Sequence, residues 1–245
     1  MYAMAPPDND VLWARSLHYS LGKSTVLSGV SLGVREAEIL ALVGPRGSGK
    51  TALMHCLSGQ AVAQQGEVWF NSGPVHTMTA AQRERLRRER FGWIDPEPGL
   101  VPELTAWENA ALPLLLRGVS HRAARTSAME WLERLDIGGS ARKRPHALTQ
   151  SQRQRIAIAR SLVTTPSVLF ADEPTASLHR ADGAQVLRTL MAAVRSHGIT
   201  VLLATHDTEV AALADRTVAL LDGRRVETAA PTTGAEGVAE CSLSV

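Results

Sequence analysis

The sequence predicts an α/β fold with a mostly parallel sheet, and three observations support this prediction. Short apolar segments alternate along the chain with segments of helical spacing, which is the pattern of parallel strands joined by helices. A motif of the form G-x-x-x-x-G-K-[ST] occupies residues 44–51, between an apolar run and a helix-like segment. A second apolar run, residues 168–171, ends directly in Asp172 and Glu173. Because the carboxyl ends of parallel strands meet at one edge of a sheet, a functional site is predicted there.

The motif at residues 44–51 predicts a loop that holds phosphate groups. Residues 39–43 are expected to form the buried strand before it, and residues 51–57 a helix whose N-terminal dipole faces the anion. Glycines let the backbone bring its N–H groups onto phosphate oxygens, Lys50 reaches the outer phosphates, and the Thr51 hydroxyl can ligate Mg2+. The predicted nucleotide-binding residues of this phosphate loop are Gly44, Pro45, Arg46, Gly47, Ser48, Gly49, Lys50, Thr51 and Ala52.

Length and composition limit the classes of protein that fit. With 245 residues, of which 44% are hydrophobic, the chain can bury the core of one large α/β domain or two small ones. Its 26 basic and 24 acidic residues nearly balance, so charge alone argues for neither nucleic acid nor an acidic membrane surface. Residues 1–10 lack the basic and apolar regions of a secretory signal, and no apolar run approaches the ~18 residues of a membrane span. A cytoplasmic location is therefore expected.

The segments around the phosphate loop predict strands, turns and one charged helical segment. Residues 1–10 are expected to be a disordered leader, and residues 11–41 to hold strands separated by glycine turns. The glycines in question are Gly22, Gly29 and Gly33. Residues 66–70 predict a further strand, with a turn at Gly73 and Pro74. Residues 79–90 carry charges of both signs at helical spacing, which favours a solvated face over a basic nucleic-acid patch.

The middle of the chain predicts a helical subdomain over about residues 97–163. Residues 91–94 predict a strand, after which two prolines require an irregular segment at residues 95–99. Helices are predicted over residues 104–116, 123–135 and 152–163 from their apolar spacing. They interrupt the alternation of strands and helices, so they are expected to be an insertion into the α/β core.

The last third of the chain returns to the α/β pattern. Strands are predicted at residues 168–171, 200–204 and 218–221, with a helix at residues 187–194 between the first two. From residue 228 to residue 245 the sequence has no periodicity and predicts a flexible tail.

Three side chains predicted at the sheet edge have the chemistry of nucleotide hydrolysis. Mg2+ needs a carboxylate opposite the loop hydroxyl, and Asp172 is placed for that role. Glu173 is then the candidate general base for a water that attacks the γ-phosphate, although two acids can also simply cap a strand. His206 ends the next strand, as either a core histidine or a donor to the γ-phosphate. Tyr19 is either a strand aromatic packed on the sheet or a stacking platform for a nucleobase.

Residues 12–227 resemble the ATP-binding subunit of an ABC transporter, on the segments 100–109, 158–162 and 171–175 in particular. The likeness is greatest to the branch that serves lipoprotein-release and macrolide-export permeases. It implies a P-loop NTPase (RecA-like) core with a parallel sheet, an antiparallel β subdomain and an inserted helical subdomain, together forming an ATP-binding domain over residues 11–227. It also implies that Tyr19 stacks on adenine, Asp172 serves the Mg2+ site, Glu173 is the catalytic base and His206 is the switch histidine.

The resemblance also implies partners: a membrane permease at the inner face of the cell membrane, and a second ATPase subunit. The two ATPase subunits, identical or different, would form a head-to-tail dimer with ATP between one phosphate loop and the other subunit's signature loop. That loop is Leu148-Thr149-Gln150-Ser151-Gln152 here, with Thr149, Ser151 and Gln152 as the predicted nucleotide contacts. No nucleic-acid partner is expected.

The chain departs from the family pattern at three places. Pro96 stands where the family has a glutamine that contacts Mg2+, Gln150 and Ser151 replace the two signature glycines, and His179 replaces an aspartate that communicates across the dimer. Losing one preorganised donor costs about 10²–10³ in rate. The resemblance therefore predicts an ATPase that energises an exporter with weak intrinsic hydrolysis, or alternatively a nucleotide-gated regulatory module with little turnover. An ATPase acting on DNA or ribosomes is disfavoured, because the sequence has no coiled-coil insertion or tandem cassette.

Overall fold

The computed structural model of the chain describes residues 10–226. The predicted leader and the predicted tail lie outside the described residues, with one exception. Asp10 is the first residue of strand β1 (Asp10–Leu21) and pairs with Arg35, so the prediction of a disordered leader is wrong at that residue.

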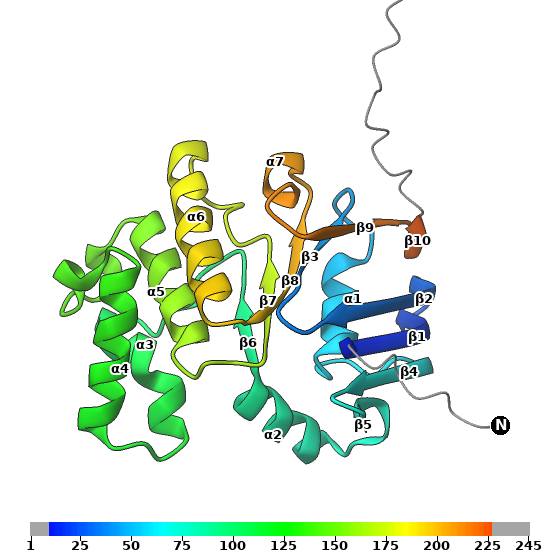
Figure 1. Cartoon of the computed structure of the whole chain (residues 1–245), viewed down its shortest axis with the longest axis horizontal. Helices are drawn as coiled ribbons and strands as arrows, with labels where there is room; N and C mark the ends of the chain where they lie inside the picture. Colours follow the sequence, from blue (N-terminus) through cyan, green and yellow to red (C-terminus); the bar gives the residue numbers. More distant parts are fainter. Residues whose placement is uncertain (1–9, 227–245) are drawn as a thin grey trace, which may run out of the picture.

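A six-stranded sheet runs through the centre of the molecule in the order β10-β9-β3-β8-β7-β6 (Figure 1). The strands are β3 (Ile39–Val43), β6 (Phe91–Ile94), β7 (Val168–Asp172), β8 (Thr200–Thr205), β9 (Arg216–Leu221) and β10 (Arg224–Val226). All neighbours are parallel except β10, which is antiparallel to β9. The predicted mostly parallel sheet is thereby confirmed. The sequence pattern missed β10, because its three residues are all exposed.

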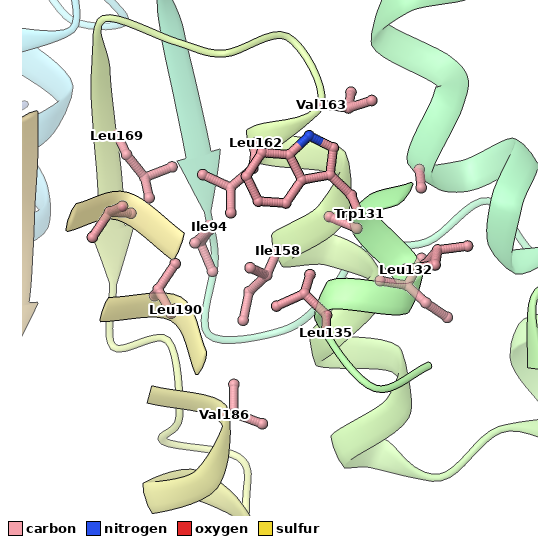
Figure 2. Packing of buried hydrophobic residues seen from close by; sticks show 14 of the residues in the cluster. Ile94, Trp131, Leu132, Leu135, Ile158, Leu162, Val163, Leu169, Val186 and Leu190 are labelled. Atoms are coloured by element: carbon pink, nitrogen blue, oxygen red, sulfur yellow. The ribbon is translucent and has the colours of Figure 1, made fainter. Parts of the chain in front are cut away.

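Alternate residues of the central strands enter two separate cores. Leu169 and Ala171 of β7 join one core with side chains of β6 and four helices, of which Figure 2 shows a part. These helices are α3 (Ala106–Leu116), α4 (His121–Arg134), α5 (Gln150–Leu162) and α6 (Arg180–Ser196). Val168 and Phe170 face the other core, with helix α1 (Lys50–Leu57) and a second sheet. Both faces of the parallel sheet are therefore covered, which explains why its strands are almost continuously apolar.

The second sheet is antiparallel and lies at the opposite end of the molecule from helices α3, α4 and α5 (Figure 1). Its order is β2-β1-β4-β5, with β2 (Ser24–Arg35), β4 (Gln65–Phe70) and β5 (Gly73–Pro74) beside β1. The predicted antiparallel β subdomain is confirmed. Gly22 lies in the turn between β1 and β2, but Gly29 and Gly33 lie inside β2, so the two turns predicted there are wrong. Gly29 has a φ of 73° at a shift of register, and marks a β-bulge.

Capping boxes mark the first turns of two helices. Thr79 forms a capping box with Gln82 at the start of α2 (Ala80–Arg90), and Thr105 forms one with Glu108 at the start of α3. No residue of α2 is buried, as its mixed charges predict. Helix α6 starts at Arg180, earlier than predicted, because its polar first turns gave no apolar signal.

The short elements are α7 (Thr208–Ala211) and the 3₁₀ segments η1 (Val75–Thr77), η2 (Gly138–Ser140) and η3 (Pro145–Ala147). The turn predicted at Gly73 and Pro74 is wrong, because those residues form β5.

Glu38 joins the antiparallel sheet to the central sheet. Its carboxylate accepts hydrogen bonds from Arg216 Nε, at 2.7 Å, and from the backbone N–H of Arg35, at 2.8 Å. Burial by itself would raise the pKa of Glu38, but these hydrogen bonds and the two arginine charges outweigh burial, so the pKa lies below its usual value of 4.5. A carboxyl with a lowered folded pKa stabilises the protein above its unfolded pKa and loses this contribution as the pH falls through the folded value.

Glu38→Gln is therefore expected to lower the free energy of unfolding at neutral pH by about 2 kcal/mol, the contribution of hydrogen bonds to a charged group. The difference from the native chain should shrink once the pH falls below about 4. Urea unfolding at several pH values would measure both effects. Glu36→Gln is the matched control, since Glu36 is exposed and its removal should change little. An equal loss for Glu38→Gln at neutral and acid pH would show that its charge is not the cause.

Candidate nucleotide-binding site

A cavity of about 560 Å³ opens at the carboxyl edge of the central sheet. The strands β3, β7 and β8 end there, which is where ligands bind in open parallel sheets. Its lining contains Tyr19, most of the phosphate loop and five further residues that matter below. The lining includes Tyr19, Arg46, Gly47, Gly49, Lys50, Thr51, Ala52, His55, Pro96, Asp172, Glu173 and His206. We call it the nucleotide cavity.

The phosphate loop, residues 44–51, wraps around the side chain of its own lysine. Lys50 Nζ donates to the carbonyl oxygens of Gly44 and Pro45, at 2.7 and 3.0 Å. The same ammonium lies 4.0 Å from Glu173 Oε1. Gly49 adopts a φ of 101°, and a Cβ there would lie 3.0 Å from the carbonyl oxygen of Val26, so only glycine lets the loop turn into α1 here. The lysine is thus held inside the loop, next to the acid that ends β7.

The Ser48 hydroxyl shows that the loop fits a phosphate group. Ser48 is almost fully buried, and within residues 10–226 its Oγ has no hydrogen-bond partner. A buried hydroxyl without a partner is costly, and a phosphate oxygen would satisfy it. Backbone N–H groups at the start of α1 supply further donors for an anion. Pro45 and Gly44 contribute the carbonyl groups that hold Lys50.

Thr51 and Asp172 provide the oxygen donors that a magnesium ion takes. Thr51 Oγ1 donates to Asp172 Oδ2 at 2.6 Å. Burial raises the pKa of Asp172, against the hydrogen bond from Thr51, so a cation beside this carboxylate would favour its charged form. Within the described residues no group of three or more histidine, cysteine or carboxylate side chains could hold a metal by itself. The residues fit a Mg2+ whose other ligands come from phosphate groups and water.

Glu173 and His206 are brought together although they lie on different strands. Glu173 follows β7 with a φ of 45°, a strained backbone for a residue other than glycine. Its N–H donates to the carbonyl of Ala204 in β8 at 2.9 Å. Its carboxylate lies 2.8 Å from His206 Nδ1. In this left-handed backbone conformation Glu173 lines the cavity, and its carboxylate lies beside Lys50 and His206.

Tyr19 lies at the far side of the nucleotide cavity, on β1 of the antiparallel sheet. It pairs with Leu27 and packs partly on the core beneath that sheet. Tyr19 thus packs partly on the core and also lines the cavity, so its packing on the sheet is confirmed and its stacking on a nucleobase stays a prediction. His55 and Pro96 also line the cavity. The sequence pattern did not indicate a role for His55, although its spacing of four residues from Thr51 places both side chains on one face of the helix.

The signature residues do not reach the nucleotide cavity of their own chain. Thr149, Ser151 and Gln152 lie at the start of α5 and line a separate hollow of about 620 Å³, together with Gln150 and His179. Thr149 Oγ1 accepts from the Gln152 N–H at 3.2 Å, and Gln152 Oε1 accepts from the Thr149 N–H at 3.1 Å. In this capping box the two side chains accept hydrogen bonds from the backbone through their oxygens, while the Thr149 O–H and the Gln152 side-chain NH2 keep their donor hydrogens.

The three departures from the family pattern lie near one another, and a hydrogen-bonded link joins two of them. Gln150 Nε2 donates to Ser177 Oγ at 3.3 Å, and Ser177 Oγ donates to the Pro96 carbonyl at 3.0 Å. His179, two residues after Ser177, is the N-cap residue of α6 without a side-chain cap. Nearby, Gln154 and Arg160 of α5 donate to the carbonyls of the Pro96 loop. These hydrogen bonds attach the Pro96 loop to helix α5 of the helical subdomain.

No helix among residues 10–226 is long and apolar enough to cross a membrane.

Comparison with known proteins agrees with this geometry. Residues 27–176 match the family model described as ABC transporter. The uncharacterized ABC transporter ATP-binding protein YbbA of Escherichia coli K12 is 37% identical, over 91% of this chain and 100% of the relative. The lipoprotein-releasing system ATP-binding protein LolD is 40% identical in Paramagnetospirillum magneticum, over 82% of this chain and 89% of that one. LolD of Psychrobacter arcticus is 42% identical, over 81% and 88%.

Solved structures give the same result. The ATP-binding cassette MJ0796, in a dimeric post-hydrolysis state bound to ADP and Pi, has a TM-score of 0.81 and 29% identity, over 88% of this chain and 97% of that chain. CbiO1 of Clostridium perfringens has a TM-score of 0.82, over 90% of this chain and 88% of that one, and at 24% identity supports the fold alone. The predicted P-loop NTPase fold is confirmed. The chain belongs to the ABC transporter family, of which it is an ATP-binding ATPase subunit.

Proposed function

We propose that this subunit binds ATP with Mg2+ in the nucleotide cavity and energises a membrane exporter by closing a head-to-tail dimer. The observation that carries the proposal is the contact set at the sheet edge. There Lys50, Glu173 and His206 form one cluster, beside the Thr51–Asp172 pair. These are the charges and donors that phosphoryl transfer to water requires.

Each cavity residue has a role in this proposal. Tyr19 stacks on the adenine, and residues 44–52 hold the phosphates. Thr51 and Asp172 would hold Mg2+, which would supply positive charge to the phosphates. Binding of the γ-phosphate draws Lys50 away from the carbonyls of its own loop. Glu173 then accepts a proton from the attacking water, and His206 donates to the γ-phosphate.

The proposed partners are a second ATPase subunit and a permease. Thr149, Ser151 and Gln152 contact the nucleotide held by the opposite subunit. The permease docks at the cytoplasmic face of the membrane, beside the Pro96 loop and the helical subdomain of residues 97–163. Trp107 is proposed to contribute to this docking surface, because its side chain is only partly buried where it packs against the helical core. The subunit is thus cytoplasmic and peripheral to the membrane.

Hydrolysis is proposed to be weak when this chain pairs with itself. In such a dimer both sites meet a signature loop in which Gln150 and Ser151 stand in place of the two glycines. Gln150 and Ser151 also hinder close approach of the backbone to the γ-phosphate. A different partner subunit with two glycines would supply the missing donors to this chain's phosphate loop. The altered signature loop of this chain would then face the partner's phosphate loop and form the slower of the two sites.

Equilibrium ATP binding and steady-state ATP hydrolysis by the purified chain test the proposal. The expected result is Mg2+-dependent ATP binding with turnover below about 1 s⁻¹, against a typical enzyme value of about 10 s⁻¹. ATP-dependent dimerisation without any turnover would favour the nucleotide-gated regulatory module instead. No binding of ATP would overturn both.

A further inference from the structure

His55 is a polar side chain of the nucleotide cavity that the proposed mechanism does not use. It lies on α1 four residues after Thr51, so the two side chains share one face of the helix, about 6 Å apart along its axis. Helical side chains lean toward the N-terminus of their helix. The imidazole is therefore directed back toward Thr51 and the pair that Thr51 forms with Asp172. Like both of these residues, His55 lines the cavity.

Stacked aromatic rings fix the position of the His55 imidazole. Its centroid lies 5.2 Å from that of Trp93 on β6, and Trp93 in turn stacks on Phe170 of β7 at 5.3 Å. Trp93 Nε1 donates to Asp95 Oδ1 at 2.8 Å, which fixes the indole in its plane. Phe170 is two residues before Asp172, so both side chains point to the same face of β7. The ring stack therefore lies beside the Thr51–Asp172 pair.

The His55 ring nitrogens are available to a ligand. Within residues 10–226 neither nitrogen makes a hydrogen bond, although the side chain is half-buried. Pro96, which also lines the cavity, has no side-chain donor or acceptor, and its carbonyl already accepts from Ser177. A Mg2+ held between this chain and the phosphates would keep several water molecules in its hydration shell. Such water needs acceptors on the protein.

We propose that His55 is a positioning residue for magnesium, whose imidazole accepts a hydrogen bond from a water molecule of the ion's hydration shell. The inference rests on the proposed function of the cavity and adds a residue to it. It assigns to α1 a contact with the metal's hydration shell, in a cavity where the side chain of Pro96 can supply none. Removal of the imidazole should weaken binding of the metal-nucleotide complex and leave binding of the free nucleotide unchanged.

Calorimetric titration with the non-hydrolysable ATP analogue AMP-PNP, with Mg2+ and with a chelator in its place, tests the inference. In the native chain Mg2+ should increase the affinity. In His55→Leu, which keeps helix propensity and an apolar side chain beside Trp93, this gain should fall about tenfold, the loss of one hydrogen bond to a charged assembly. His55→Gln, whose amide oxygen can accept from the same water, should retain most of the gain. His146→Leu, at an exposed site, is the control and should match the native chain.

Each other outcome has a definite meaning. If His55→Leu keeps the full Mg2+ gain, the inference is wrong and the proposed function stands. If the substitution weakens binding equally with and without Mg2+, His55 only packs against Trp93, and the inference is again wrong. If the native chain itself shows no gain from Mg2+, the magnesium part of the proposed function fails, and the inference fails with it.

Discussion

Glu173→Gln is expected to lower steady-state ATP hydrolysis by about 10²–10⁴-fold, the usual contribution of a general base. Glutamine has nearly the same shape, but its amide cannot accept the proton of the attacking water. ATP binding should persist, because the phosphates are held by Lys50 and the loop. Loss of the negative charge 4.0 Å from Lys50 should leave the ammonium more available to the γ-phosphate, so affinity for ATP should stay equal or rise.

Two measurements check this prediction. Phosphate release measures turnover, and size-exclusion chromatography with ATP measures the dimer, which should accumulate when hydrolysis cannot reopen it. Glu130→Gln is the matched control, because Glu130 is exposed on α4 and away from the cavity. Equal turnover in the native chain and in Glu173→Gln would mean that Glu173 is not the base, and that the activity belongs to another group or another protein.

Restoring glycine at both altered signature positions, Gln150→Gly with Ser151→Gly, is expected to raise hydrolysis by about 10²–10³-fold. That is the effect of one preorganised transition-state donor. The glycines remove two side chains from the face that meets the opposite nucleotide, and they free Ser177 from its bond to Gln150. They also weaken the first turn of α5, by at most about 1 kcal/mol each, so the melting temperature should fall slightly.

The gain is to be measured as turnover at saturating ATP, with binding affinity measured alongside. Adding Glu173→Gln to the double-glycine variant should abolish the gain, which would assign it to this cavity. A folded double-glycine variant that binds ATP without faster turnover would contradict the prediction. In that case Pro96 or His179 would hold back hydrolysis.

The fold could be predicted from the sequence for elements whose type follows from a local pattern of residues. The phosphate loop has a fixed spacing and a strand-loop-helix context, and the apolar runs of β3, β7 and β8 are too short for helices. Elements without an apolar signal were missed or shortened, such as β10 and the first turns of α6. The glycines inside β2 were misassigned, because a bulge and a turn use the same residue type.

In the candidate site, too, the residues that a local motif fixes could be predicted, and those that depend on contacts between distant segments could not. Lys50, Thr51 and Asp172 follow from motif and strand ends, since each role needs one residue type at one place. His55 resembled a core position, because its neighbours Met54 and Cys56 are apolar and buried. Its significance depends on Trp93, which comes from a different strand. The link from Gln150 through Ser177 to Pro96 joins positions far apart in the chain, and only the folded arrangement brings them together.

That link has a consequence for how the sequence can change. A single serine hydroxyl serves two of the three altered segments, and the third begins two residues later. Substitutions at these places are therefore expected to be epistatic, with coupling energies of about 0.5–3 kcal/mol between residues of one network. A return to glutamine at Pro96 would act on a loop that Ser177 still holds in its present shape. Evolution toward or away from the common ABC pattern would then favour changing these segments together.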